Sequence, residues 1–255
     1  MRPLSMKHRA MKHPMLVLLL ALALMGSSMA CSLLGGWRVV RGSGRVVEEE
    51  REVSGFTGVA LNGVGHLTIE RGDTERLRIE AEDNLLPYIE TQISGGVLEI
   101  GQRTNVNLWP KRPINFYLTV VNLESVAVSG SGQVEAPVLE AERFSLAISG
   151  SGDAKMDGLD TQELTVQISG SGKVDIAGGK ADKQDVSISG SGRYTARDLE
   201  SMDAQVRISG SGSATIRVSD NLDVTVSGSG DVQYLGRPRI QQAVSGSGKV
   251  RSIGD

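Results

Sequence analysis

The sequence contains few of the residues that disulfide frameworks and many catalytic sites require. Its one cysteine, Cys31, cannot form a disulfide within the chain. Of its three histidines only His66 lies outside the first 30 residues, so a Ser/His nucleophilic mechanism would have to use His66 as its base. Because His66 lies in a stretch of alternating polar and apolar residues, we expect it to have a structural or surface role. We therefore assign no catalytic residue.

The sequence also lacks an apolar run long enough to cross a bilayer as a helix. The run from Met15 to Met25 has 11 residues, whereas a spanning helix needs about 20. Basic residues precede this run and small residues follow it as far as Ala30, which predicts a signal peptide over residues 1–30. The chain is therefore expected to be exported.

Cys31 stands at the predicted cleavage site, and the residues around it resemble a bacterial lipoprotein signal. This resemblance implies that Cys31 is lipidated and anchors the chain in a membrane, and Ser32 beside it implies an outer-membrane lipoprotein. Ser28 departs from the pattern, which usually has an aliphatic residue there. Because Ser28-Met29-Ala30 also suits an ordinary secretory signal, secretion without lipid is the alternative.

Positive charge is scarce once the signal peptide is removed. The mature chain keeps 23 Lys and Arg against 30 Asp and Glu, a net charge of −7, which argues against nucleic acid as a partner. Aromatic residues make up only 4% of the chain, which contains 32 glycines. This composition is typical of all-β repeat proteins.

Two regions lie between the signal peptide and a C-terminal repeat. Residues 31–45 contain several glycines and serines and are predicted to be a flexible, lipid-anchored tether. Residues 46–125 contain stretches with the alternation of strands, such as HLTIE from His66 and RLRIEAE from Arg76, and a short helical turn near Pro87. We interpret this N-terminal β region as the opening coils or cap of the fold that follows, with a separate small β domain as the alternative.

Residues 126–255 form a repeat that is marked by the sequence SGSG. The first serines of the seven copies are 20, 20, 20, 20, 18 and 18 residues apart, which is typical of a solenoid. Serine and glycine suit a tight bend between packed strands, so we interpret each copy as a structural corner, with a polar face for a glycan or a partner strand as the alternative. The predicted corner residues are Ser129, Gly130, Ser149, Gly150, Ser169, Gly170, Ser189, Gly190, Ser209, Gly210, Ser227, Gly228, Ser245 and Gly246.

The residues that precede each SGSG keep one register. The positions one and three before it are both apolar in six of the seven copies, and the position between them tolerates charge. Such a coil can bury its apolar side only by stacking on its neighbours at about 4.8 Å. The predicted fold is therefore all-β, a parallel β-helix (β-solenoid) with coils of 18 to 20 residues, right-handed as parallel crossovers generally are. Gln242 interrupts the apolar pattern, which predicts a frayed or capping last coil.

The N-terminal β region carries a family resemblance. Residues 53–70, the segment LRIEAEDNLLPYIETQISGGVLEI from Leu77, and the strand that leads to the first VSGSG resemble the bacterial envelope domain called the putative auto-transporter adhesin, head GIN domain. The resemblance spans roughly residues 50–250. It implies an exported β-helical protein, commonly a lipoprotein, and it provides no catalytic residues to transfer.

The sequence gives little support for metal, phosphate or carbohydrate-cleaving chemistry. Calcium-binding β-rolls repeat every nine residues, which the observed spacing excludes, and no phosphate-binding motif is present; we expect no metal and no cofactor. Polysaccharide-cleaving β-helices need clustered acids. The position after SGSG is instead mixed in sign, which favours a solvated outer surface: Gln133, Asp153, Lys173, Arg193, Ser213, Asp231 and Lys249.

The sequence thus predicts a non-enzymatic, lipid-anchored protein of the cell envelope whose solenoid surface serves adhesion, scaffolding or binding. The expected partners are the membrane, through the N-terminal lipid, and a glycan or envelope protein. The alternative is a carbohydrate-active β-helix protein that binds or cleaves a polysaccharide. A third hypothesis is self-association through the ends of the solenoid, because the last coil is weakly apolar.

Overall fold

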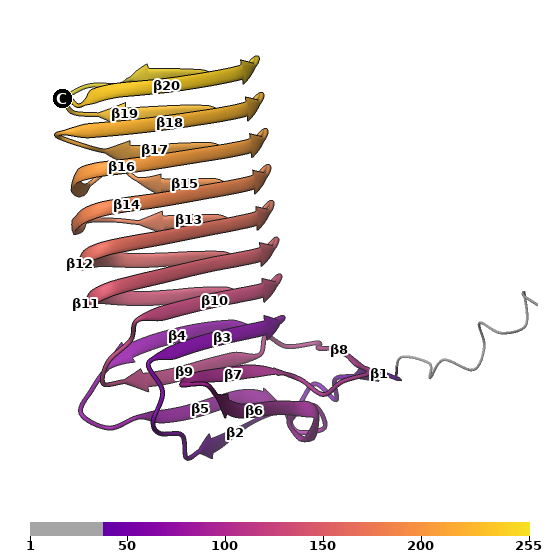
Figure 1. Ribbon diagram of the computed structural model, residues 1–255. Helices are drawn as coiled ribbons and strands as arrows, with labels where there is room; N and C mark the ends of the chain where they lie inside the picture. The colour runs from indigo at the N-terminus through magenta and orange to yellow at the C-terminus, as the bar shows by residue number, and fades with distance from the viewer. Residues whose placement is uncertain (1–37) are drawn as a thin grey trace, which may run out of the picture. The chain divides into compact units, whose positions relative to one another are not determined.

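The computed structural model describes residues 38–255 (Figure 1), so the predicted signal peptide, Cys31 and the first part of the tether lie outside the described residues. Nearly all secondary structure in residues 38–255 is β-strand, and 19 of the strands belong to one continuous sheet. None of the helical segments in this part of the chain is long and apolar enough to cross a membrane.

The C-terminal part winds into a parallel β-solenoid of about six turns (Figure 1). Each strand pairs in parallel with its equivalent one coil away, for example Ser125 with Ser145. The predicted all-β solenoid fold is therefore confirmed. Its strands are β10 (Ser125–Gly130), β11 (Gln133–Gly150), β12 (Asp153–Gly170), β13 (Lys173–Ile176), β14 (Gly179–Gly190), β15 (Arg193–Ala196), β16 (Leu199–Gly210), β17 (Ser213–Arg217), β18 (Asn221–Gly228), β19 (Asp231–Leu235), β20 (Arg239–Gly246) and β21 (Lys249–Ser252).

The core consists of apolar columns that run from coil to coil. The residue before each SGSG pairs with its equivalents in the neighbouring coils, so that Ile168 lies between Ile148 and Ile188. These three side chains are at most 2% exposed, while Gln167, one residue earlier, is exposed. Because side chains alternate between the two faces of a strand, stacking equivalent coils joins their apolar faces into one core.

The SGSG segments lie where one strand of a coil ends and the next begins. Gly170 has a φ of +121°, and a Cβ there would lie 2.3 Å from the carbonyl oxygen of Gly150 in the preceding coil. A Cβ on Gly172 would lie 2.4 Å from the oxygen of Gly152. The amide of Ser171 donates a hydrogen bond of 2.8 Å to the Gly150 oxygen. Backbone contact between successive bends therefore leaves no room for a side chain at either glycine.

A buried network of hydrogen-bonded polar residues, which spans successive coils, interrupts the apolar columns. Gln184 pairs with Leu164 and Ala204 in the stack and is 0% exposed. Its amide oxygen accepts a hydrogen bond of 2.7 Å from the Tyr194 hydroxyl, and its amide nitrogen donates one of 3.0 Å to Ser201. Ser201 in turn donates to a backbone carbonyl. Gln184, Tyr194 and Ser201 thus all have hydrogen-bond partners, which offsets the free-energy cost of burying their polar groups.

The N-terminal region continues the same sheet but mixes strand directions. β3 and β4 pair in parallel with β10 and β11, which places Asn62-Gly63 beside Ser129-Gly130. β5 pairs antiparallel with β9 and with β2, and β6 pairs antiparallel with β7. Its elements are β2 (Val46–Arg51), β3 (Gly58–Gly63), β4 (His66–Arg71), β5 (Arg76–Glu82), the 3₁₀ turn Leu86–Tyr88, β6 (Ile89–Ser94), β7 (Val97–Gln102), β8 (Val106–Trp109) and β9 (Asn115–Val120).

Ordered structure begins earlier than the expected boundary at residue 46. β1 (Arg38–Arg41) pairs with β8 in a separate two-stranded sheet, although the sequence assigns these residues to the flexible tether. Gly44 and Lys111 both donate backbone hydrogen bonds to the buried carboxylate of Glu82. This distant acceptor orders a glycine-rich segment whose local composition favours flexibility.

At the C-terminal end of the described chain the inward side of the last coil is uncovered. Every residue of β20 is exposed, including Ile240 at 38% and Val244 at 41%. Gln242 occupies the position of this strand that is apolar in the other coils. The polar residue therefore stands where the core meets solvent.

Replacing Ile168 with Asp is expected to destabilise the solenoid by at least about 3 kcal/mol, because the charge would be buried among apolar side chains without a partner. Gln167→Asp, which puts the same charge one residue away on the exposed face, should change the stability little. Chemical denaturation measures both. An unchanged transition for Ile168→Asp would contradict the coil register.

Replacing Gly170 with Ala is expected to cost about 2 kcal/mol or more, because the backbone has a positive φ and the methyl group would clash with the preceding bend. Ser169→Ala, in the same bend, removes only an exposed hydroxyl and should stay within about 0.5 kcal/mol of the wild type. Thermal unfolding followed by circular dichroism compares them. Equal stabilities of the two variants would show that the bends do not depend on glycine.

Candidate functional site

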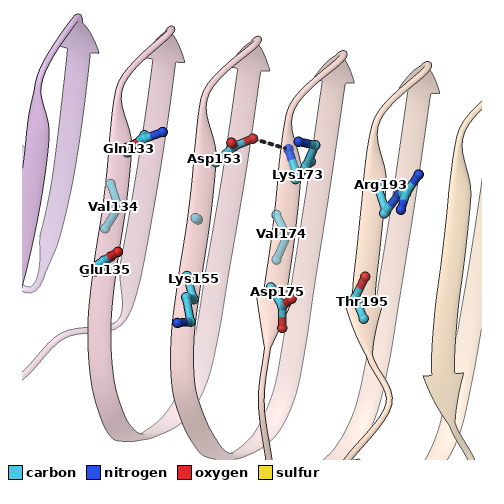
Figure 2. A pocket seen from close by; sticks show the side chains of 11 residues that line it. Gln133, Val134, Glu135, Asp153, Lys155, Lys173, Val174, Asp175, Arg193 and Thr195 are labelled. Atoms are coloured by element: carbon cyan, nitrogen blue, oxygen red, sulfur yellow. Dashed lines mark hydrogen bonds between the residues drawn. The ribbon is translucent and has the colours of Figure 1, made fainter.

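Six charged side chains of the solenoid line a shallow groove on the outer face of four successive coils. The groove has a volume of about 420 Å³ and is formed by the first residues of β11, β12, β13 and β15 (Figure 2). Each of these strands starts directly after an SGSG bend. The bends therefore fix the position in each coil at which the groove residues occur.

Two rows of side chains form the groove, because alternate residues of each strand point outward. The first row is the position after SGSG, and the second row lies two residues further along each strand. Parallel pairing stacks each row from coil to coil, while Val134 and Val174 between the rows point into the core. The first row is Gln133, Asp153, Lys173 and Arg193, and the second is Glu135, Lys155, Asp175 and Thr195 (Figure 2).

The groove contains three carboxylates and three cations, so its net charge is zero. Asp153 accepts a hydrogen bond of 3.1 Å from the backbone amide of Lys173 in the next coil (Figure 2). None of the cations Lys155, Lys173 and Arg193 forms an ion pair with another residue of the described chain. Their donors are therefore free to bind a ligand.

His66 lies at the N-terminal edge of the groove. β4 pairs with β11, and this pairing places His66 beside Gln133. The Nδ1 atom of His66 is 3.3 Å from the Gln133 amide oxygen, and the Nε2 atom is 3.5 Å from a carboxylate oxygen of Glu135. His66 thus contacts two groove side chains, and among residues 38–255 it forms no hydrogen bond with a serine that it could activate.

A second polar cluster lies on the same face, over β5 and β9. The Arg78 guanidinium lies 4.0 Å above the ring of Tyr117 and donates to Glu80. Asn115 and Tyr117 donate to the same carboxylate at 3.3 and 3.1 Å. Burial raises the pKa of Glu80, but the hydrogen bonds from Arg78, Asn115 and Tyr117 outweigh it and hold that pKa below its usual value. The cluster is internally satisfied and extends the polar face beyond the groove.

The arrangement is suited to binding an extended polar ligand. Rows of cations, carboxylates and amides that repeat from coil to coil can contact successive units of a polymer that runs across the strands. No group of three or more His, Cys, Asp or Glu residues within the described range could hold a metal ion.

In the sequence, the position after SGSG identifies only the first row of this face. Glu135, Lys155 and Asp175 follow that row by two residues, and the strand alternation could have identified them as its neighbours. With both rows present, three acids and three cations share one groove. The first row alone has one acid and two cations. The SGSG serines border this groove at the bends, and Cys31 lies outside the described residues.

Solved structures of bacterial proteins share this fold. A putative adhesin from Bacteroides fragilis has a TM-score of 0.78 at 21% identity, over 84% of this chain and 100% of that one. A putative adhesin from Parabacteroides merdae has a TM-score of 0.64 at 24% identity, over 85% of this chain and 99% of that one. A putative lipid binding protein from Parabacteroides distasonis has a TM-score of 0.68 at 21% identity, over 85% and 100%.

The family comparison reaches most of the described chain. No curated protein matches the sequence. The sequence model of one family, described as "Putative auto-transporter adhesin, head GIN domain", matches residues 55–238. This range contains strands β3 to β9 of the N-terminal region, the groove and the SGSG bends up to Gly228. The chain therefore belongs to the putative auto-transporter adhesin, head GIN domain family.

Proposed function

We propose that this protein is a non-enzymatic binding protein of the cell envelope that adheres to a polysaccharide through its groove. The observation that carries the proposal is the pair of aligned rows, in which three cations form no ion pair with any residue of the range 38–255. A glycan presents hydroxyl and charged groups at regular intervals, and stacked coils present donors and acceptors about every 4.8 Å. The adhesin descriptions of the family and of its structural neighbours support this function.

The N-terminus supports an envelope location. A signal peptide over residues 1–30 would export the chain, and lipid on Cys31 would hold it at the outer membrane. A tether would then keep the solenoid close to the surface while leaving its groove exposed. The protein would act as an anchored binding surface and not as a freely diffusing one.

A second candidate function is cleavage of the bound polysaccharide. Glu135, Asp153 and Asp175 share the groove with three cations, and polysaccharide-cleaving enzymes combine acids with basic residues. Fold analogy alone gives this candidate little weight. Release of shortened, unsaturated or reducing-end products, lost in a Glu135→Gln/Asp153→Asn/Asp175→Asn variant, would replace the binding role with an enzymatic one.

Reversing two groove charges should weaken polysaccharide binding. In a screen of immobilised envelope polysaccharides, Lys173→Glu/Arg193→Glu is expected to bind at least about tenfold less tightly, since charge-assisted hydrogen bonds are lost. The matched control is Lys183→Glu/Arg197→Glu, which makes the same change in net charge at exposed residues outside the groove. Equal losses in both variants would point to a general charge effect and would remove the groove from the proposal.

Replacing Cys31 with Ser should release the protein from membranes, because the acceptor of the lipid would be lost. Fractionation of cells that express the wild-type and Cys31→Ser chains measures this. Radiolabelled palmitate should appear in the wild-type chain only. Continued membrane fractionation of the Cys31→Ser chain, with no label in the wild type, would reject lipid anchoring. A soluble, exported wild-type chain without label would indicate ordinary secretion.

A further inference from the structure

A second candidate surface lies where the chain from the predicted anchor enters the fold. β1 and β8 form their two-stranded sheet beside the N-terminal strands and away from the SGSG coils (Figure 1). The segment after β1 and the segment after β8 are irregular. We call the exposed side chains of Val39, Arg41, Trp109, Lys111 and Arg112 the tether face.

Glu82, at the end of β5, fixes both irregular segments. Its side chain is 0% exposed, and its carboxylate accepts backbone hydrogen bonds from Gly44 at 2.5 Å, from Lys111 at 2.8 Å and from Arg112 at 3.4 Å. A Cβ on Gly42 would overlap this carboxylate, so glycine is required for the close approach. One buried anion thus gathers residues 42–44 and 111–112 around itself.

The tether face exposes large apolar side chains. Trp109 is 65% exposed and Val39 is 54% exposed, the two highest values among the exposed large hydrophobic residues of the described chain. The amide of Gly42 donates a hydrogen bond of 3.0 Å to the Trp109 carbonyl, which holds the Trp109 backbone beside the chain that leaves β1. A largely exposed tryptophan on a fixed backbone leaves apolar area in contact with water, which is typical of an interaction surface.

The same face carries uncompensated positive charge. Arg41, Lys111 and Arg112 are exposed, and none of them forms an ion pair with a residue of the described range. The two adjoining acids are already engaged, because Glu82 accepts backbone amides and Asp83 binds Arg45 and Ser43. The tether face therefore combines a tryptophan with three free cations, in a mature chain whose net charge is −7.

The length of the tether determines what this face can meet. Val39 lies eight positions after Cys31, and even fully extended these eight steps span at most roughly 29 Å. With lipid on Cys31, the Val39 end of the tether face would always lie within that distance of the bilayer. Tryptophan is enriched at the level of lipid headgroups, and basic residues are attracted to anionic lipids.

We propose that the tether face docks on the headgroup region of a bilayer that contains anionic lipid. This inference rests on the proposed function for the presence of the membrane, but its contacts belong to the folded domain and not to the lipid. Trp109 and Val39 insert between headgroups, and Arg41, Lys111 and Arg112 bind headgroup anions. Docking fixes the orientation of the solenoid relative to the membrane.

The test uses the fluorescence of Trp109 in the full chain. Trp37→Phe leaves Trp109 as the only tryptophan. On vesicles with anionic phospholipid, its emission is expected to shift to shorter wavelength and to be quenched by brominated lipid, and the shift should be absent with purely zwitterionic vesicles or at high salt. Lys111→Glu/Arg112→Glu, which leaves the backbone bonds to Glu82 in place, should abolish the shift.

A matched control places the probe elsewhere on the domain. Val138 is 45% exposed on the solenoid, so Trp37→Phe/Trp109→Phe/Val138→Trp should keep the emission of a tryptophan in water on the same vesicles. Vesicle flotation, measured in parallel, reports the anchor. Flotation with water-exposed Trp109 would overturn the tether face while leaving the anchor intact, and loss of both would overturn both. A shift in the emission wavelength of Trp109 that occurs only with added envelope protein would assign the tether face to a protein partner and overturn the membrane proposal.

Discussion

The structure depends on the close approach of successive bends. Each first glycine of an SGSG segment has a positive φ, and a Cβ there would clash with the carbonyl oxygen of the equivalent glycine one coil earlier. The amide that follows, as at Ser171, donates to that same oxygen. This contact fixes the distance between coils and their register at one point in every turn. Once the register is fixed, alternation alone decides which side chains enter the core and which form rows outside.

The outer rows follow from that register. Residues 20 positions apart become lateral neighbours about 4.8 Å apart. The side chains at outward positions therefore determine the pattern of charge on the surface, and substitutions there leave the core unchanged. The groove is one such pattern, in which the sign of charge changes between neighbouring coils at Asp153 and Lys173. The buried Gln184 and Tyr194 show the opposite situation. An inward polar residue requires hydrogen-bond partners, and Gln184 finds both of its partners, Tyr194 and Ser201, in the next coil.

The sequence was sufficient to predict the solenoid because one signal, SGSG with its apolar neighbours, occurs seven times in one register. It was insufficient where a contact depends on a single distant residue. The alternation around Arg78 predicts a strand, but it does not show that β5 inserts antiparallel beside β9 and brings Glu80 to Tyr117. Likewise the glycines of residues 42–44 indicate flexibility, and only the buried carboxylate of Glu82 explains their order. The second row of the groove was accessible from alternation and needed only the residue two positions beyond each marker.

The charge distribution connects the two surfaces. The groove is neutral, whereas the tether face carries three positive charges, which leaves a net charge of −10 for the rest of the mature chain. An anionic membrane would repel that remainder and attract the tether face, and both effects act over about a Debye length of 8 Å at physiological salt. In the proposed arrangement only the tether face is attracted: without it, residues 38–125 carry a net charge of −6 and residues 126–255 carry −4, so repulsion opposes contact of any other surface with the lipid. A lipid anchor alone provides proximity but no orientation. The segments held by Glu82 would provide the orientation, and the groove would then face the medium in which its ligand lies.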